Sequence, residues 1–162
     1  MAWGMRNVVI VLYGSSIMEG RIGVEDPRDR WYHLLQVRLS RTFPDICFPV
    51  INSAVGGEST REVLSRFGRD VLPYRPDFCL FMVGGNNHDC KDPKRILAEG
   101  ELEALLPQFA ARLPTRTRPV GVVLNPVVDR WHFAPRHPAY REYLAAFGGS
   151  LDASLNPERE LA

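Results

Sequence analysis

Residues suited to acyl chemistry stand directly after an apolar run near the start of the sequence. The run at residues 8–13 leads into Gly14-Ser15-Ser16-Ile17. A serine in this position can act as a nucleophile once a base takes its hydroxyl proton. The pattern Ser16-x-x-Glu19 is also that of a helix capping box, in which the hydroxyl satisfies a backbone N–H. Considered alone, the segment favours the cap.

A second loop carries paired glycines. Residues 52–60 read Asn-Ser-Ala-Val-Gly-Gly-Glu-Ser-Thr and follow the apolar run at 48–51. Paired glycines let the backbone approach a ligand closely, and one N–H can point at an anion. The alternative is a tight turn into a helix capped by Ser59 or Thr60, and this loop alone favours that alternative.

A third loop is rich in asparagine. Residues 84–89 read Gly-Gly-Asn-Asn-His-Asp after the apolar run at 78–83. An asparagine amide at a strand end can donate to a developing oxyanion, and one such donor is worth about 2.7–4 kcal/mol. Turn and cap roles for Asn87 and Asp89 are the alternative. His88 and Asp89 are possible metal ligands, but two adjacent residues make a poor site, so we expect no metal.

The elements around these loops predict an α/β fold. The continuous apolar runs at 8–13, 48–51, 78–83 and 120–124 are typical of strands buried on both faces. Helical spacing of apolar residues predicts helices at about 29–41, 59–72, 93–113 and 140–147, although Gly100 disfavours the third. Strands alternating with helices predict a parallel sheet, whose binding site lies at the carboxyl ends of the strands. The three loops should therefore meet at one edge of a single domain over residues 1–162.

The order of the three loops resembles the GDSL or SGNH hydrolase family. Gly14-Ser15-Ser16-Ile17 corresponds to the family's Gly-Asp-Ser block, and Ser16 aligns with the nucleophile. The resemblance covers roughly residues 7–128. It implies a three-layer α/β/α fold with a parallel, flavodoxin-like sheet, the SGNH hydrolase fold.

The resemblance also assigns an oxyanion hole. Asn52 and Gly57 match the family's second block, whose glycine N–H lines the hole. Residues 84–87 match Gly-x-Asn-Asp, so Asn86 is the implied side-chain donor, beside the backbone N–H of Ser16. Asn87 stands where the family has Asp, as does Ser15 in the first block. Both changes remove charge near the site, which bears on loop rigidity and rate more than on reaction class.

In that family an Asp-x-x-His block supplies the base and the carboxylate that orients it. Of the four histidines only His132 follows an Asp at this spacing, in Asp129-Arg130-Trp131-His132. One interpretation takes Asp129 and His132 as a displaced acid–base pair. A second, which we favour, places the pair beyond Ala162, in a last strand and helix that this chain lacks, because Asn156-Pro157-Glu158 starts a helix that the chain leaves short. A third is a chain that never had the pair.

Hydrolysis of a small-acyl carboxylic ester is the function that the resemblance implies. Ser16 would form an acyl-enzyme, with no metal or organic cofactor, and Trp131 and Phe133 are candidates to line the pocket. Acyl transfer on the same fold is one alternative. Another is a non-catalytic binding module that lacks its base. A flavodoxin-like nucleotide binder is less favoured, because no glycine-rich phosphate-binding pattern occurs.

Composition further limits the class of protein to which this chain can belong. The 162 residues include 20 basic and 19 acidic ones, which gives a net charge of +1. A charge so close to zero does not indicate a nucleic-acid-binding protein. Cys47, Cys79 and Cys90 form no Cys-x-x-Cys pair, which favours buried free thiols over a zinc site or disulfides. The apolar run at 8–13 is too short to span a membrane. We therefore expect a cytoplasmic protein with a small-molecule ester substrate, of undetermined oligomeric state.

Overall fold

A parallel sheet forms the centre of the molecule. The computed structural model describes residues 4–21, 24–87, 92–98 and 100–160. Four parallel strands pair in the order β4-β2-β5-β6, and their bounds are β2 (Ile10–Gly14), β4 (Val50–Asn52), β5 (Phe78–Met82) and β6 (Arg118–Gly121). A two-stranded parallel pair, β1 (Arg6–Asn7) and β3 (Ile46–Cys47), precedes β2 and β4. The predicted parallel sheet is confirmed.

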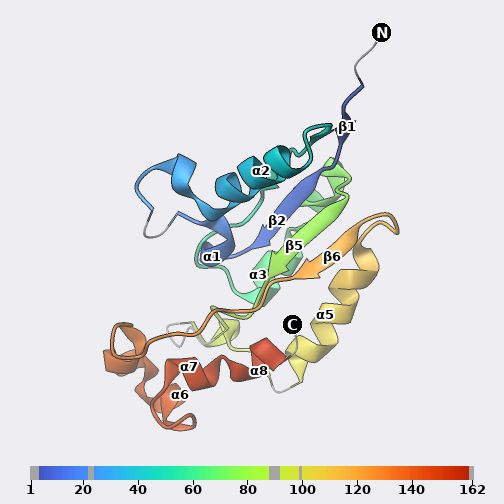
Figure 1. The fold of residues 1–162 in the computed structure, drawn as a ribbon. Coiled ribbons are helices and arrows are strands. Elements are labelled where there is room, and N and C mark those ends of the chain that lie inside the picture. The colour runs from blue at the N-terminus through green and yellow to red at the C-terminus, as the bar shows by residue number, and fades with distance from the viewer. Residues whose placement is uncertain (1–3, 22–23, 88–91, 99, 161–162) are drawn as a thin grey trace.

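Helices cover both faces of this sheet (Figure 1). Alternate residues of β2 enter two separate apolar clusters, because successive side chains of a strand point to opposite faces. Ile10 and Leu12 pack with residues of α2, α6 and α7, whereas Val11 and Tyr13 pack with residues of α3, α4 and α5. The bounds are α2 (Trp31–Thr42), α3 (Thr60–Ser65), α4 (Phe67–Asp70), α5 (Glu101–Arg112), α6 (Arg141–Ala145) and α7 (Leu151–Ser154). The predicted three-layer α/β/α arrangement is confirmed.

Two predicted helices have different bounds in the structure. The segment expected at 93–113 begins its helix only at Glu101, after a separate 3-10 turn at Pro93–Arg95. Gly100 lies at the N-cap with φ 74°, a left-handed conformation that glycine adopts without strain, so it starts the helix and does not interrupt it. The segment expected at 59–72 divides into α3 and α4 at Arg66.

The fourth strand also differs from its prediction. It occupies Arg118–Gly121, two residues before the expected run at 120–124, and all four residues are exposed. The reason is its position, since β6 pairs with β5 on one side and is the edge strand of the described sheet. An edge strand need not be buried on both faces, so its apolar run was not a reliable sign of burial.

The chain after β6 brings three short helices to the carboxyl ends of the strands. In Figure 1, α6, α7 and α8 (Asn156–Glu160) lie beyond the arrowheads of the sheet. The helix start expected at Asn156 is present, and α8 packs against the body through Arg159. Its guanidinium donates to the carbonyl oxygens of Leu124 at 3.1 Å and Asn125 at 2.9 Å. These contacts join α8 to the segment that leaves the sheet.

The described cysteines are free thiols. Cys79 is a buried free thiol, as predicted, and burial raises its pKa to about 12. Cys47 is half-buried, and Cys90 lies outside the described residues. In the described part of the chain, no helix has the length and apolar character that crossing a membrane requires.

Candidate active site

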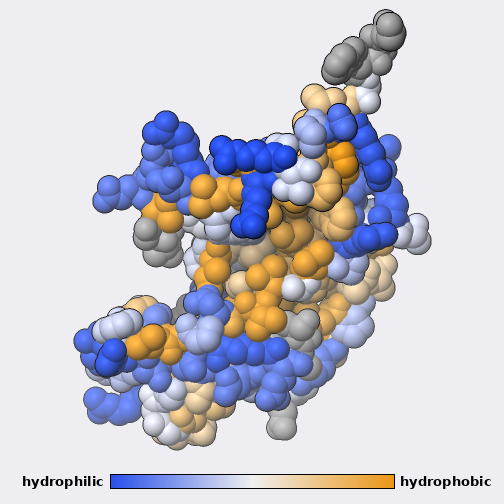
Figure 2. Space-filling model, viewed as in Figure 1, coloured by the Kyte–Doolittle hydropathy of each residue, from blue (hydrophilic) through white to orange (hydrophobic). Residues whose placement is uncertain are grey.

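Ser16, Gly57 and Asn86 come together at one cavity of about 360 Å³. Ser16 opens α1 (Ser16–Glu19) after β2, Gly57 follows β4, and Asn86 follows β5. Figure 2 shows a hollow between the part of the molecule that carries α2 and the part that carries α6 and α7, with apolar side chains on its wall. The cavity is also lined by Ile17, Gly85, Arg95, Leu124, Asn125, Val127, His132, Phe133, Tyr140, Leu151 and Leu155.

The hydroxyl of Ser16 does not form the capping box that its spacing permits. Ser15 is the N-cap residue of α1, and its side chain makes no cap hydrogen bond. Ser16 is the first residue of the helix, half-buried, and its side chain makes no hydrogen bond to another described residue. The cap interpretation of Ser16 and Glu19 is therefore wrong, and Ser16 is one of the residues that line the cavity.

Gly14 sets the position of this serine. Its φ is 149°, and a Cβ placed on it would lie 2.3 Å from the carbonyl oxygen of Met82 on β5. A side chain at position 14 would push apart two paired strands whose register joins Gly14 to Met82. The close approach of β2 and β5 thus requires glycine two residues before Ser16.

Ser16 also lines a second cavity, of about 460 Å³. Its wall contains Trp31 and Leu34 of α2, with Asp29 from the preceding turn. Ser16, Ile17 and Asn125 line both cavities. A molecule bound at Ser16 therefore adjoins two cavities.

The loop that contains Gly57 is held by side chains rather than by regular structure. The Asn52 amide donates to the carbonyl oxygen of Glu19 at 3.2 Å, and its Oδ1 accepts the N–H of Ala54 at 3.0 Å. These bonds join the end of α1 to the start of the loop. Gly57 has φ 84°, in the left-handed region, with open space where a Cβ would be. The backbone at Gly57 is therefore accessible from the cavity.

Asn86 joins the second and third loops. Its Nδ2 donates to the carbonyl oxygen of Glu58 at 2.8 Å. A primary amide carries two hydrogens, so this bond leaves one for a ligand in the cavity that Asn86 lines. The bond to the residue after Gly57 also sets the distance between the two groups that the resemblance assigned to an oxyanion hole.

Ser59 and Asn87 have the capping roles that the sequence offered as alternatives. Ser59 and Glu62 form a capping box at the start of α3, and hydrogen bonds from the Ser59 N–H and hydroxyl lower the pKa of the Glu62 carboxyl. Asn87, only 4% exposed, accepts the Thr60 N–H through Oδ1 at 3.0 Å. His88 and Asp89, considered above as metal ligands, lie outside the described residues.

Asp129 and His132 make separate contacts. Oδ1 of Asp129 accepts the N–H of Leu151 at 2.9 Å, and Oδ2 accepts the Ser150 hydroxyl at 2.6 Å, so the carboxylate caps the start of α7. Nδ1 of His132 accepts the N–H of Ala134 at 3.2 Å. Within the described residues the two side chains share no hydrogen bond. His132 lines the cavity and Asp129 does not, so of the displaced pair that the sequence offered as one interpretation, only His132 lies at the cavity of Ser16.

Nothing in the sequence indicated some of the residues that line the cavity, and one residue predicted to line it does not. Arg95 lines it and donates to the carbonyl oxygen of Gly57 at 2.8 Å, yet no spacing in the sequence marks it. Tyr140, expected only as a helix start, lines the same wall. Phe133 is part of the lining, as anticipated. Trp131 is not; it is 72% exposed, with the guanidinium of Arg130 over its ring.

The parallel α/β/α sandwich with polar loops at the carboxyl ends of its strands is the fold of the GDSL hydrolases. The chain belongs to the GDSL-like lipase/acylhydrolase family, whose model matches residues 12–156. A comparison with curated proteins found no match.

Solved structures share this fold at low sequence identity. A lipase/acylhydrolase from Enterococcus faecalis has a TM-score of 0.59 at 19% identity, over 89% of this chain and 73% of that one. An α/β hydrolase enzyme from the metagenome of Lake Arreo, Spain, has a TM-score of 0.60 at 23% identity, over 97% and 72%. A two-domain esterase active on acetylated mannans has a TM-score of 0.54 at 22% identity. That match covers 72% of this chain and 29% of the esterase, so the chain spans less than a third of that protein's length.

Proposed function

We propose that this protein hydrolyses a carboxylic ester through an acyl-enzyme on Ser16. The observation that carries the proposal is that Ser16, Gly57 and Asn86, from the ends of three different strands, line one cavity. A hydroxyl beside hydrogen-bond donors that converge on the same space is the arrangement that acyl transfer needs.

The reaction follows from these positions. Oγ of Ser16 attacks the carbonyl carbon while a base takes its proton, and the carbonyl oxygen becomes an oxyanion. The N–H groups of Ser16 and Gly57 and the second amide hydrogen of Asn86 donate to that oxyanion. Collapse of the tetrahedral intermediate expels the alcohol, which receives the proton. Water then attacks the acyl-enzyme, and the carboxylic acid leaves while Ser16 regains its proton.

His132 is the base that we propose within the described residues, because it lines the same cavity as Ser16. In a neutral imidazole one nitrogen donates and the other accepts. With Nδ1 accepting from Ala134, the proton lies on Nε2. For Nε2 to take the Ser16 proton, Nδ1 must release the Ala134 N–H and become protonated. Asp129 is the carboxylate that sequence spacing assigned to orient this ring, and its present contacts at α7 do not support that role.

The acyl group that we propose is small. One structural neighbour is an esterase active on acetylated mannans. Here the two cavities that Ser16 lines have volumes of about 360 and 460 Å³, enough for a short acyl group in one and an alcohol in the other. The expected substrate is accordingly an acetyl or similarly short ester.

Replacement of Ser16→Ala tests the nucleophile. We expect turnover of 4-nitrophenyl acetate to fall to background, and a fluorophosphonate probe to label the wild-type protein but not the variant. Ser15→Ala is the matched control, since Ser15 is buried, makes no side-chain cap bond and does not line the cavity. Full activity in the Ser16 variant would contradict the proposal.

A non-catalytic binding module on the same fold is the second candidate. The contacts of Asp129 favour it, since a carboxylate that caps α7 does not orient an imidazole. A serine without an activated base is a weak nucleophile. This candidate predicts no labelling of wild-type protein by the fluorophosphonate, together with binding of an unreactive ester analogue.

A further inference from the structure

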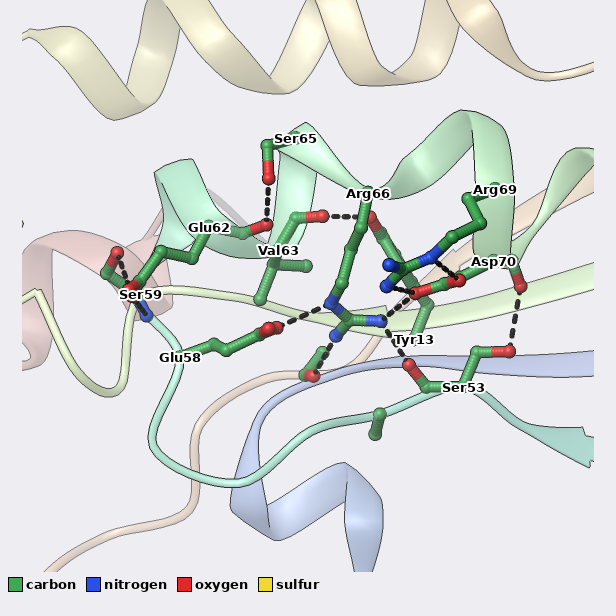
Figure 3. Close-up of polar contacts among 12 residues, drawn as sticks. Tyr13, Ser53, Glu58, Ser59, Glu62, Val63, Ser65, Arg66, Arg69 and Asp70 are labelled. Atoms are coloured by element: carbon green, nitrogen blue, oxygen red, sulfur yellow. Dashed lines mark hydrogen bonds and ion pairs between the residues drawn. The ribbon is translucent and has the colours of Figure 1, made fainter.

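Arg66 is a buried cation at the junction of α3 and α4, and Figure 3 shows its polar contacts. Its side chain is 7% exposed. Nε donates to the Glu58 carboxylate at 2.6 Å, and Nη2 donates to the carbonyl oxygen of Gly14 at 3.0 Å. Nη1 donates to the carbonyl oxygen of Ser53 and to the Asp70 carboxylate. One guanidinium therefore has four partners from three separate segments.

The partners of Arg66 lie next to the groups that we propose act in catalysis. Gly14 precedes Ser16 by two residues, and Glu58 directly follows Gly57. The carbonyl oxygen of Glu58 in turn accepts the Asn86 amide. The guanidinium thus joins the segment that carries Ser16 to the loop that carries Gly57. Figure 3 shows its bonds to Ser53 and Glu58 of that loop.

Geometry explains why this bridge is an arginine. The guanidinium is planar, with five donors in a fixed fork, whereas a lysine ammonium is a point charge on a flexible stem. The Arg66 fork reaches two carbonyl oxygens and two carboxylates in different directions, and its Cζ lies 4.9 Å from the centre of the Tyr13 ring. Tyr13 is fully buried and donates its hydroxyl to the carbonyl oxygen of Val63. The ring and the fork together give Arg66 one orientation.

We infer that Arg66 is a positioning residue that fixes the spacing between Ser16 and the oxyanion donors through Gly14 and Glu58. The inference rests on the proposed function. In this role Arg66 touches no substrate. It acts on the placement of the loops and not on the chemical step. Misplacement of reacting groups by about 1 Å can cost roughly 100-fold in rate, so small shifts of the loop have large effects.

Two partners of Arg66 supply a matched pair of variants. Glu58→Ala and Asp70→Ala each remove one carboxylate from the guanidinium, but only Glu58 lies in the loop of Gly57. We expect Glu58→Ala to lower kcat for 4-nitrophenyl acetate by roughly 10- to 100-fold with KM unchanged. Asp70→Ala should lose stability and keep kcat within about twofold. Arg66→Lys should behave like Glu58→Ala, since it keeps the charge and loses the fork.

Hydrogen exchange of the same variants tests the inference without relying on activity. We expect faster amide exchange in peptides covering residues 14–20 and 53–60 in Glu58→Ala, and wild-type exchange there in Asp70→Ala. Unchanged exchange in both loops, or an equal loss of kcat in the two alanine variants, overturns the inference. If wild type and Ser16→Ala are equally inactive, the proposed function fails, and the exchange result still decides the role of Arg66.

Discussion

Asn87 accepts the backbone N–H of Thr60 through its side-chain oxygen at 3.0 Å, and the Thr60 hydroxyl accepts the N–H of Gly84 at 3.1 Å. These two bonds join the loop after β5 to the first turn of α3. All three groups are buried. The loops that carry Asn86 and Gly57 are therefore held together through hydrogen bonds that lie outside the cavity itself.

Loss of the Asn87 side chain should destabilise the protein. Asn87→Ala leaves the Thr60 N–H buried without a partner, and we expect a loss of about 1–3 kcal/mol in the free energy of unfolding. Urea denaturation followed by circular dichroism measures it. Gln108→Ala, a change on the exposed face of α5, is the control and should stay within about 0.5 kcal/mol of wild type. An equal effect of both changes would show that the bond to Thr60 contributes nothing.

Asn86 should matter to rate and not to substrate affinity. Asn86→Ala removes an oxyanion donor, so we expect kcat to fall by roughly 100- to 1,000-fold with little change in KM. Steady-state kinetics on 4-nitrophenyl acetate measures both constants. Asn125→Ala removes another amide from the same cavity wall and serves as the control. If kcat survives in the Asn86 variant, the oxyanion is bound elsewhere.

Replacement of Asp129 distinguishes a structural role of this residue from a catalytic one. Asp129→Ala removes the acceptor of the Leu151 N–H and of the Ser150 hydroxyl, so we expect a loss of about 1–2 kcal/mol in stability. The folded variant should keep kcat within about twofold of wild type. Thermal unfolding and kinetics on the same sample test this. A folded variant without activity would instead support the pairing with His132 that its spacing suggested.

Low pH should reduce the free energy of unfolding through protonation of Asp70. Hydrogen bonds from Arg69 and then Arg66 lower the pKa of this carboxyl to about 2, from 3.8. A carboxyl with a lower pKa in the folded state stabilises the fold above pH 4 and loses that contribution as the pH falls to 2. We expect about 1–2 kcal/mol to disappear in that range, since Arg69 is largely exposed and its share is screened.

The variant Asp70→Asn isolates this titration. Its free energy of unfolding should change less between pH 4 and pH 2 than that of wild type, and the two curves should differ most at neutral pH. Guanidinium-free urea titrations at several pH values compare them, which avoids added salt. Parallel curves for the two proteins would mean that Asp70 is not responsible for the acid sensitivity.

Local sequence was enough to predict the sheet and the three loops. Continuous β-branched and aromatic runs placed β2 and β5 correctly, because a strand buried on both faces needs apolar residues at every position. The positions of Ser16, Gly57 and Asn86 at one cavity followed from chain direction, since parallel strands end at the same edge. These features depend on short stretches of chain and on one topological rule.

Tertiary contacts decided the rest. Asp129 stands three residues before His132, yet its carboxylate binds the start of α7, because a capping site 22 residues away offers it two N–H donors and a hydroxyl. Arg66 looks like an ordinary surface residue of a helix, yet it lies at the junction of α3 and α4, where its guanidinium donates to Gly14 and Glu58. Spacing along the chain determines which side chains are neighbours in sequence. Which donor each charged group meets depends on segments that fold onto it from elsewhere.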